Sequence, residues 1–295
     1  MLSYQHAYHA GNFADVLKHG TLCWVLDYLL QKDKAFYFHD THAGRGLYSL
    51  DSLEAQKTGE HQDGIARVWQ QPDIPSVLLP YINTLKTFNA GVNGQGTEDK
   101  LRRYAGSPLL AHRLLRRVDR LCCTELHPQE FTALRQATNN KRNMRILRTD
   151  GYEALKAALP PVERRGVILI DPSYELPGDD AAVILSLREG LLRFPEGIFL
   201  LWYPLVQPAR SRDLINKAQK LVNQNLLLLE LSVASATEQG YVRQGKRRGM
   251  YGTGMLLVNP PWQLDMLMAE ALPWLVQKLA PDTGSSRVEW LRGAV

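Results

Sequence analysis

The stretch Val167-Ile168-Leu169-Ile170-Asp171-Pro172-Ser173-Tyr174 constrains the fold of this 295-residue chain more than any other. A continuous apolar, mostly β-branched run is typical of a strand buried on both faces, in the centre of a parallel sheet. Pro172 has no N–H and biases Asp171 away from helical dihedral angles, so the strand must end there. Ligands bind beside the loops that leave the carboxyl ends of such strands. We therefore expect Asp171 and Tyr174 at the rim of a crevice.

This turn has the chemistry to hold a flat base that carries an amino group. The Asp171 carboxylate and the Pro172 carbonyl can each accept an N–H proton, and the Tyr174 ring can stack on the base. A lone Asp-Pro-x-Tyr is more often an ordinary turn, so a functional interpretation depends on what else the chain brings to the same place.

A glycine-containing turn, Asp40-Thr41-His42-Ala43-Gly44-Arg45-Gly46, follows the predicted first strand, residues 35–40. Two glycines directly after a strand let the backbone approach a ligand closely. The dinucleotide fingerprint needs a third glycine, and Ser49 stands at that position. The turn thus favours a nucleoside ligand without a pyrophosphate, such as S-adenosylmethionine, over the cofactor of a nucleotide-dependent oxidoreductase.

Acidic residues follow four successive predicted strands, at Asp40, Glu125, Asp150 and Asp171. Because the carboxyl ends of parallel strands share one edge of the sheet, we expect these acids to converge on one crevice. Glu125 is placed to accept hydrogen bonds from both ribose hydroxyls, and Asp150 from an adenine amino group. Each acid alone could be a solvated cap; the four together predict a nucleoside site.

The composition is that of a soluble, cytoplasmic globular protein. The chain has 35 Lys and Arg against 30 Asp and Glu, a mildly basic balance that permits a nucleic-acid partner. Its 3 cysteines are too few and wrongly spaced for a zinc site, so we expect no metal. No signal peptide or membrane-spanning run is indicated. A basic, glycine-rich stretch contains Lys246, Arg247 and Arg248 and is a candidate phosphate-binding surface, although a solvated hairpin tip is the simpler interpretation.

Several further motifs together resemble the RlmJ family, ribosomal RNA adenine-N6 methyltransferases that act on large-subunit (23S) RNA. The resemblance runs essentially from end to end of the chain. It is carried by the following segments: Ser3-Tyr4-x-His6, His9-Ala10-Gly11-Asn12, Ala14-Asp15-Val16-Leu17-Lys18-His19, the turn at 40–46, Gly106-Ser107-Pro108, Thr124-Glu125-Leu126-His127-Pro128, Asp150-Gly151, Leu169-Ile170-Asp171-Pro172-x-Tyr174-Glu175, Trp202-Tyr203-Pro204 and Asn259-Pro260-Pro261-Trp262.

The resemblance implies an α/β fold, the Rossmann-like S-adenosylmethionine-dependent methyltransferase fold with a seven-stranded, mostly parallel sheet. Residues 1–46 and 107–295 would form the methyltransferase domain, and 47–106, where the strand-helix rhythm breaks off, an inserted helical subdomain. Ser107 is expected to cap the helix that resumes the alternation, with Pro108 at its first position. The substrate would be protein-free 23S RNA or an early assembly intermediate, and the enzyme a monomer.

The resemblance also implies roles for individual residues. Asp171 would be the catalytic acceptor, with Pro172 and Tyr174 beside it, and Tyr4 would approach the RNA. The implied cofactor contacts, together with the glycine turn, are Lys18, His19, His42, Gly44, Ser107, Glu125, Asp150, Gly151 and Asp171. One position departs from the family: Ser173 replaces a second proline, which loosens the turn, and we expect activity to be retained but reduced.

Alternatives exist for the catalytic residue and for the function. Asn259-Pro260-Pro261-Trp262 matches the general adenine-methyltransferase pattern as well. The order of the glycine turn, the ribose acid and the adenine acid along the chain assigns catalysis to Asp171 instead. The chain could also be a DNA adenine-N6 methyltransferase, or a catalytically weakened nucleic-acid-binding homologue if Ser173 signals decay.

Overall fold

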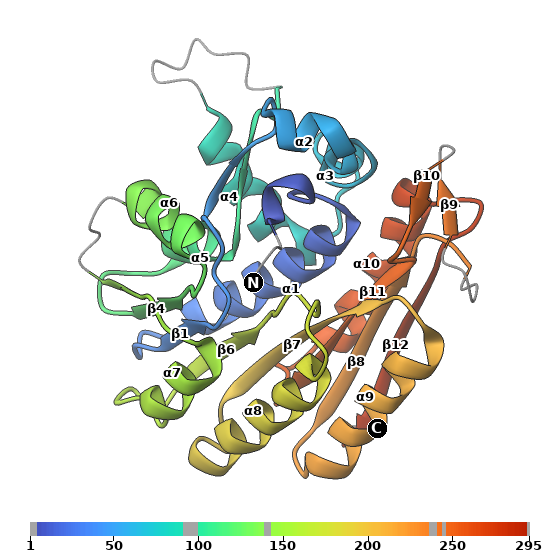
Figure 1. Cartoon of the computed structure of the whole chain (residues 1–295). Helices are drawn as coiled ribbons and strands as arrows, with labels where there is room; N and C mark the ends of the chain where they lie inside the picture. The colour runs from blue at the N-terminus through green and yellow to red at the C-terminus, as the bar shows by residue number, and fades with distance from the viewer. Residues whose placement is uncertain (1–4, 91–99, 139–142, 236–240, 244–245, 294–295) are drawn as a thin grey trace.

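The structure, a computed structural model, describes residues 5–90, 100–138, 143–235, 241–243 and 246–293, with 241–243 and 246–248 as backbone only. At its centre, the described residues form an eight-stranded sheet in the order β12-β8-β11-β7-β6-β1-β4-β5 (Figure 1). Five strands are parallel: β1 (Tyr37–Asp40), β4 (Arg120–Thr124), β5 (Met144–Leu147), β6 (Gly166–Ile170) and β7 (Ile198–Leu205). Three antiparallel strands complete it: β8 (Leu226–Ser232), β11 (Gly252–Val258) and β12 (Ser285–Arg292).

The α/β class is confirmed, but the predicted strand count of seven is wrong by one. The additional strand, β12, is the edge of the sheet and pairs only with β8 among the described strands. Its side chains are exposed or half-buried, and charged residues such as Arg287 and Glu289 interrupt it. The strand therefore has no apolar run that a sequence pattern could detect. β11 is an internal strand of the sheet, between β7 and β8.

Strand β6 is the buried centre that the sequence predicts. All five of its residues are buried, and it lies between β1 and β7. The chain runs outward from β1 through β4 to β5, and then returns through β6 to β7. The order therefore reverses between β1 and β6, which creates the crevice where open α/β sheets bind ligands.

Helices cover both faces of the sheet (Figure 1). One face carries α1 (Phe13–Leu30), α5 (Ser107–Leu114), α6 (Pro128–Thr138) and α10 (Leu264–Leu279), and the other α7 (Gly151–Ala158), α8 (Asp179–Arg193) and α9 (Pro208–Leu221). Asn12 caps α1, because its side chain accepts from the N–H groups of Ala14 and Asp15. Ser107 does not cap α5: Gly106 is the cap and Ser107 is the first helical residue.

Residues 47–106 leave the sheet after β1 and return at α5. They contain short helical segments and a two-stranded antiparallel ribbon, so the segment is not purely helical. Its elements are β2 (Leu47–Ser49), α2 (Leu53–Thr58), η2 (Glu60–Asp63), α3 (Ile65–Val68), η3 (Ser76–Leu78), α4 (Leu79–Asn89) and β3 (Arg103–Ala105). The segment packs against α1 and α10. A further short helix, η1 (His6–Tyr8), precedes α1, and the ribbon of β9 (Tyr241–Arg243) and β10 (Lys246–Arg248) projects from the antiparallel end of the molecule (Figure 1). None of the helices in the described ranges is long and apolar enough to cross a membrane.

Candidate active site

A cavity of about 570 Å³ opens at the carboxyl ends of the parallel strands, where the strand order reverses. Its volume is in the usual range for small-molecule and cofactor sites. The loops after β5, β4 and β1 form one side, and the loops after β6 and β7 form the other. Its lining residues include the following from those loops, the start of α7 and the end of β7: His42, Gly44, Glu125, Asp150, Gly151, Asp171, Pro172, Ser173, Tyr174, Trp202 and Pro204. The predicted convergence of strand-end residues on one crevice therefore holds for Glu125, Asp150 and Asp171.

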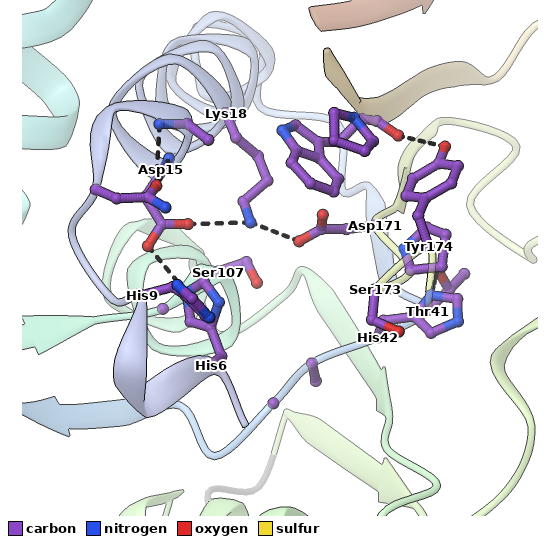
Figure 2. Close-up of a pocket in the computed structure, with 18 of the residues that line it drawn as sticks. His6, His9, Asp15, Lys18, Thr41, His42, Ser107, Asp171, Ser173 and Tyr174 are labelled. Carbon is purple, nitrogen blue, oxygen red and sulfur yellow. Dashed lines mark hydrogen bonds and ion pairs between the residues drawn. The ribbon is translucent and has the colours of Figure 1, made fainter. Parts of the chain in front are cut away.

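At the centre of this cavity, Asp171 forms an ion pair with Lys18 of α1 (Figure 2). The Lys18 Nζ lies 2.6 Å from Asp171 Oδ2, and the two side chains are only 6% and 11% exposed. Burial raises the pKa of Asp171, and the Lys18 ammonium opposes that shift. Burial alone would lower the pKa of Lys18, but the carboxylates of Asp171 and Asp15 raise it above its usual range. The family resemblance implies a cofactor contact for Lys18; in the structure its ammonium pairs with two carboxylates and lies 5.4 Å from the centroid of the Trp202 ring.

A second carboxylate, Asp15, holds the same lysine from the other side (Figure 2). Its Oδ1 lies 3.1 Å from Lys18 Nζ, and its Oδ2 accepts from the Gly11 N–H at 2.8 Å and lies 2.9 Å from His6 Nε2. Burial would raise the pKa of Asp15, but His6, Lys18 and His19 hold it well below its usual range. Nothing in the local sequence distinguishes Asp15 from an ordinary acid in the first turn of a helix, so this arrangement could not be predicted from it.

The glycine turn after β1 is fixed by Glu125. Gly44 and Gly46 have φ values of +62° and +80°, a left-handed conformation that glycine adopts without strain. Glu125 Oε2 accepts from the Gly44 N–H at 2.8 Å, and Oε1 accepts from the His127 N–H at 2.7 Å. Burial raises the pKa of Glu125, and these two N–H groups oppose it. The carboxylate is thus held next to the glycine turn, with lone pairs left over for ribose hydroxyls.

His42 and Asp150 lie on the same side of the cavity. His42 Nδ1 is 2.8 Å from Thr41 Oγ1. The His42 and Tyr152 rings are in edge-on contact, with their centroids 5.0 Å apart. Burial lowers the pKa of His42 to about 4, so the imidazole is neutral at physiological pH. Asp150 Oδ1 caps α7 by accepting from the N–H groups of Tyr152 and Glu153. Asp150 therefore has a structural task in addition to the adenine contact expected of it.

Gly151 offers a test of this side of the cavity. A Cβ at position 151 would lie 2.0 Å from the backbone oxygen of Thr41, so Gly151→Ala must push α7 away from the β1 turn. We expect S-adenosylhomocysteine to bind at least about 10-fold more weakly in calorimetry, and the unfolding free energy to fall by about 1–3 kcal/mol. Glu153→Ala, at an exposed position of the same helix, is the control. Unchanged affinity in Gly151→Ala would show that the ligand does not use this wall.

On the other side of the cavity, Tyr174 is held in place by β7. Its φ is +56°, its ring is 7% exposed, and its hydroxyl donates to the Trp202 carbonyl at 2.7 Å. The Trp202 ring lies 5.8 Å from it at 60°, and the Arg210 guanidinium lies 5.6 Å from its ring centroid. These contacts fix the aromatic ring beside Asp171 although the turn contains Ser173 instead of a second proline. Trp202 and Arg210 line the cavity and were not predicted as site residues.

Asp40 is buried beneath the site and does not line the cavity. Its side chain is fully buried, and its Oδ2 has no hydrogen-bond partner among the described residues. Burial raises the pKa of Asp40 to about 7, although hydrogen bonds from Ser107 and from the His42 N–H oppose the shift. The prediction that four strand-end acids line one crevice is therefore correct for three of them, whereas Asp40 is buried behind the cavity wall.

The raised pKa of Asp40 predicts a pH dependence of stability. Between pH 4 and 7 the folded protein keeps a proton on Asp40 that the unfolded chain has lost. The unfolding free energy therefore falls as pH rises, by up to about 1.4 kcal/mol per pH unit from this group. His39 and His42, whose pKa values burial lowers to about 4, contribute the opposite slope in acid. In urea unfolding from pH 5 to 8, the unfolding free energy of the wild type should fall relative to that of Asp40→Asn as pH rises; a constant difference between the two proteins would contradict the assignment.

His19 and Ser107 line the cavity, but they are largely enclosed by protein. His19 is 2% exposed, and its Nδ1 is 2.6 Å from the Tyr104 hydroxyl, which in turn contacts Tyr81 at 2.9 Å. Burial lowers the pKa of His19 to about 3, so this ring is neutral. Ser107 is 4% exposed. Cofactor contacts by these two residues remain predictions.

Several predicted residues cannot be placed at the cavity. Tyr4 lies outside the described residues. Lys246, Arg247 and Arg248 form β10, which is described as backbone only; the residues just after it, Gly249 and Met250, line the cavity. Among the described residues, no group of three or more His, Cys, Asp or Glu side chains could hold a metal ion.

The second adenine-methyltransferase pattern, at Asn259, lies at the other end of the strands, where the parallel strands begin. β11 is antiparallel to β7, so its last residue, Val258, pairs with Phe199 near the start of β7. The Asn259 amide donates to the carbonyls of Pro195 and Gly197 at 2.8 and 2.9 Å. It tethers two loops and is remote from the cavity, whereas Asp171 lies inside it.

Comparison with known proteins agrees with this geometry. A family model described as "Ribosomal RNA large subunit methyltransferase D, RlmJ" matches residues 33–292. The chain belongs to this family. The resemblance to the RlmJ family is thereby confirmed over nearly the whole chain.

Individual relatives match the chain from end to end. The protein named ribosomal RNA large subunit methyltransferase J of Escherichia coli (strain K12) is 46% identical over 292 residues, 99% of each chain. Its namesake in Haemophilus influenzae is 43% identical over the same share. The crystal structure of protein LPL1258 from Legionella pneumophila is 33% identical, with a TM-score of 0.85 over 96% of this chain and 98% of that one.

Proposed function

We propose that the protein transfers the methyl group of S-adenosylmethionine to the N6 amine of one adenine in 23S ribosomal RNA. Membership in the RlmJ family supports ribosomal RNA methylation in general. The observation that carries the finer assignment is that Asp171 shares one cavity with the glycine turn and with Glu125. A nucleoside cofactor and an amine-binding carboxylate would thus meet at one edge of the sheet.

The cavity fits S-adenosylmethionine on its β1 and β4 side. Gly44 and Gly151 line the cavity with backbone alone, and Glu125, which accepts from the Gly44 N–H, can also accept from ribose hydroxyls. His42 is neutral and in edge-on contact with Tyr152, a pair of rings suited to enclosing an adenine. When bound there, S-adenosylmethionine supplies an electrophilic methyl group on a sulfonium.

The residues around Asp171 supply the chemistry for the target amine. Adenine N6 is a poor nucleophile because its lone pair is delocalised into the ring. We assign its two protons to Asp171 Oδ1 and the Pro172 carbonyl, which would localise the lone pair as charge develops. Lys18 occupies Asp171 Oδ2 and favours the ionised carboxylate. As the N–CH3 bond forms and the S–CH3 bond of the sulfonium breaks, the amine would lose one proton, which Asp171 would accept directly or through water. Tyr174 would hold the unstacked base.

Parts of the chain outside the cavity are proposed to contact the RNA. We assign residues 47–106 to the substrate side as an inserted subdomain, because they pack on α1, which carries Lys18. Tyr4 and the basic strand β10 are the proposed RNA contacts. The net charge of +5 is compatible with RNA binding. We further propose that the enzyme acts as a cytoplasmic monomer on protein-free RNA or an early assembly intermediate.

Methylation assays with labelled S-adenosylmethionine test the proposal. The substrates are 23S RNA from cells that lack this gene product, assembled large subunits and duplex DNA. We expect one N6-methyladenine, mapped by mass spectrometry, in naked RNA, and little or none in the other two. Preferential labelling of DNA would instead establish a DNA adenine methyltransferase. No transfer to any substrate would indicate a non-catalytic nucleic-acid-binding homologue.

A further inference from the structure

Asp15 is a buried carboxylate that the proposed reaction leaves without a task. It is 1% exposed, and a carboxylate is costly to bury unless it is paired. Helix α1 does not need it as a cap, because Asn12 already accepts from the first two free N–H groups. Asp15 instead faces Lys18 with one oxygen and Gly11 and His6 with the other.

The line of groups Asp15, Lys18 and Asp171 places one ammonium between two carboxylates. Lys18 Nζ lies 3.1 Å from Asp15 and 2.6 Å from Asp171, and all three side chains are nearly or fully buried. In such an arrangement the positive charge is shared, so neither carboxylate receives the full stabilisation of an isolated pair.

We propose that Asp15 is a positioning residue for methyl transfer: it holds Lys18 at Asp171 and, by sharing the charge of Lys18, keeps Asp171 basic enough to accept the amine proton. This inference rests on the proposed function. Asp15 also fixes the segment before α1, because the Gly11 N–H and His6 converge on its second oxygen.

The charge on Asp15 favours a higher pKa of Asp171 in two ways. It repels the ionised form of Asp171, and it competes for the Lys18 ammonium. The other titratable groups near this line come from η1, α1, β1, β2, α4 and β3: His6, His19, Asp40, Tyr48, Tyr81 and Tyr104. Burial raises the pKa values of the three tyrosines above the pH range of an activity assay, and it lowers the pKa of His19 below that range. These four side chains are therefore neutral during the assay.

The test is the pH dependence of kcat in Asp15→Asn, which removes the charge with little change of shape. We expect kcat at pH 7.5 to fall about 10-fold and the acid midpoint to move about one pH unit lower. The KM for RNA should change less than about 3-fold, because the Asp15 side chain is only 1% exposed and can offer RNA almost no surface. Asp213→Asn, in the exposed pair with Lys217, is the matched control with wild-type kinetics.

A purely structural role predicts a different result. It would lower the amount of active enzyme and leave the acid midpoint unchanged; that outcome, or a midpoint at higher pH, overturns the proposal. If Asp15→Asn does not fold, Asp15→Glu keeps the charge, and should keep the wild-type midpoint while kcat falls; a shifted midpoint there overturns it equally.

An assay without turnover separates this inference from the proposed function. In enzyme labelled with carbon-13 at aspartate carboxyls, the Asp171 signal is identified by its loss in Asp171→Asn. Its titration should move to lower pH in Asp15→Asn. If wild-type enzyme methylates no RNA, the proposed function fails, while this titration still decides whether Asp15 sets the basicity of Asp171.

Discussion

Asp171→Ala is expected to lower kcat for RNA methylation by about 10³-fold or more while cofactor affinity stays within a few-fold of wild type. Alanine has no side-chain oxygen, so it can neither accept a hydrogen bond from the amine N–H nor take up the proton that the amine loses. Initial rates with labelled S-adenosylmethionine and calorimetry with S-adenosylhomocysteine would measure the two quantities separately.

Asn259→Ala is the informative comparison, because Asn259 carries the competing sequence pattern. Its amide bonds the carbonyls of Pro195 and Gly197 at the far edge of the sheet, so its loss should reduce stability by about 1–3 kcal/mol and leave kcat unchanged. If Asn259→Ala were inactive and Asp171→Ala active, the catalytic assignment to the loop after β6 would be wrong.

Lys18→Met should be nearly as damaging and should change the pH profile in a defined direction. Burial already raises the pKa of Asp171, and Lys18 is the largest opposing influence. Without the ammonium, the Asp171 pKa rises further, so a larger fraction is protonated at pH 7 and unable to accept. We expect kcat at pH 7 to fall about 10²-fold or more, and to recover partly as pH increases toward 9.

The matched control for this change is Lys217→Met, which removes an exposed ammonium from its pair with Asp213. Exposed pairs of this kind contribute little, so kinetics and pH profile should remain those of wild type. The acid midpoint of kcat should thus move up in Lys18→Met and down in Asp15→Asn. Shifts of the same sign in both variants would be incompatible with an ammonium shared between two carboxylates.

Local patterns were enough to locate most of the site. The apolar run before Asp171 predicts a buried central strand, and β6 is that strand. An acid that follows a parallel strand lies at the carboxyl end of that strand. This is why Glu125 and Asp150 line the same cavity as Asp171. The Asn12 cap was predictable for the same reason, since its partners are its next neighbours.

Long-range pairing was not predictable in this way. Lys18 and Asp171 are 153 residues apart, and the pairing depends on how α1 packs over the sheet. Asp40 and Asp171 both end apolar strands, yet only the packed structure shows that the first lies beneath the cavity and the second inside it. β12 escaped detection because an edge strand with exposed charges has no apolar pattern.

The sequence by itself determined the fold class, the central strand and the set of acids at the strand ends, because each depends on residues adjacent along the chain. Only the tertiary structure decided which charges share a buried space. Asn259 was assigned to the far edge by the antiparallel direction of β11, and Lys18 was brought between Asp15 and Asp171 by the packing of α1. Burial then makes those few contacts strong, since charges removed from water interact at short range with little screening.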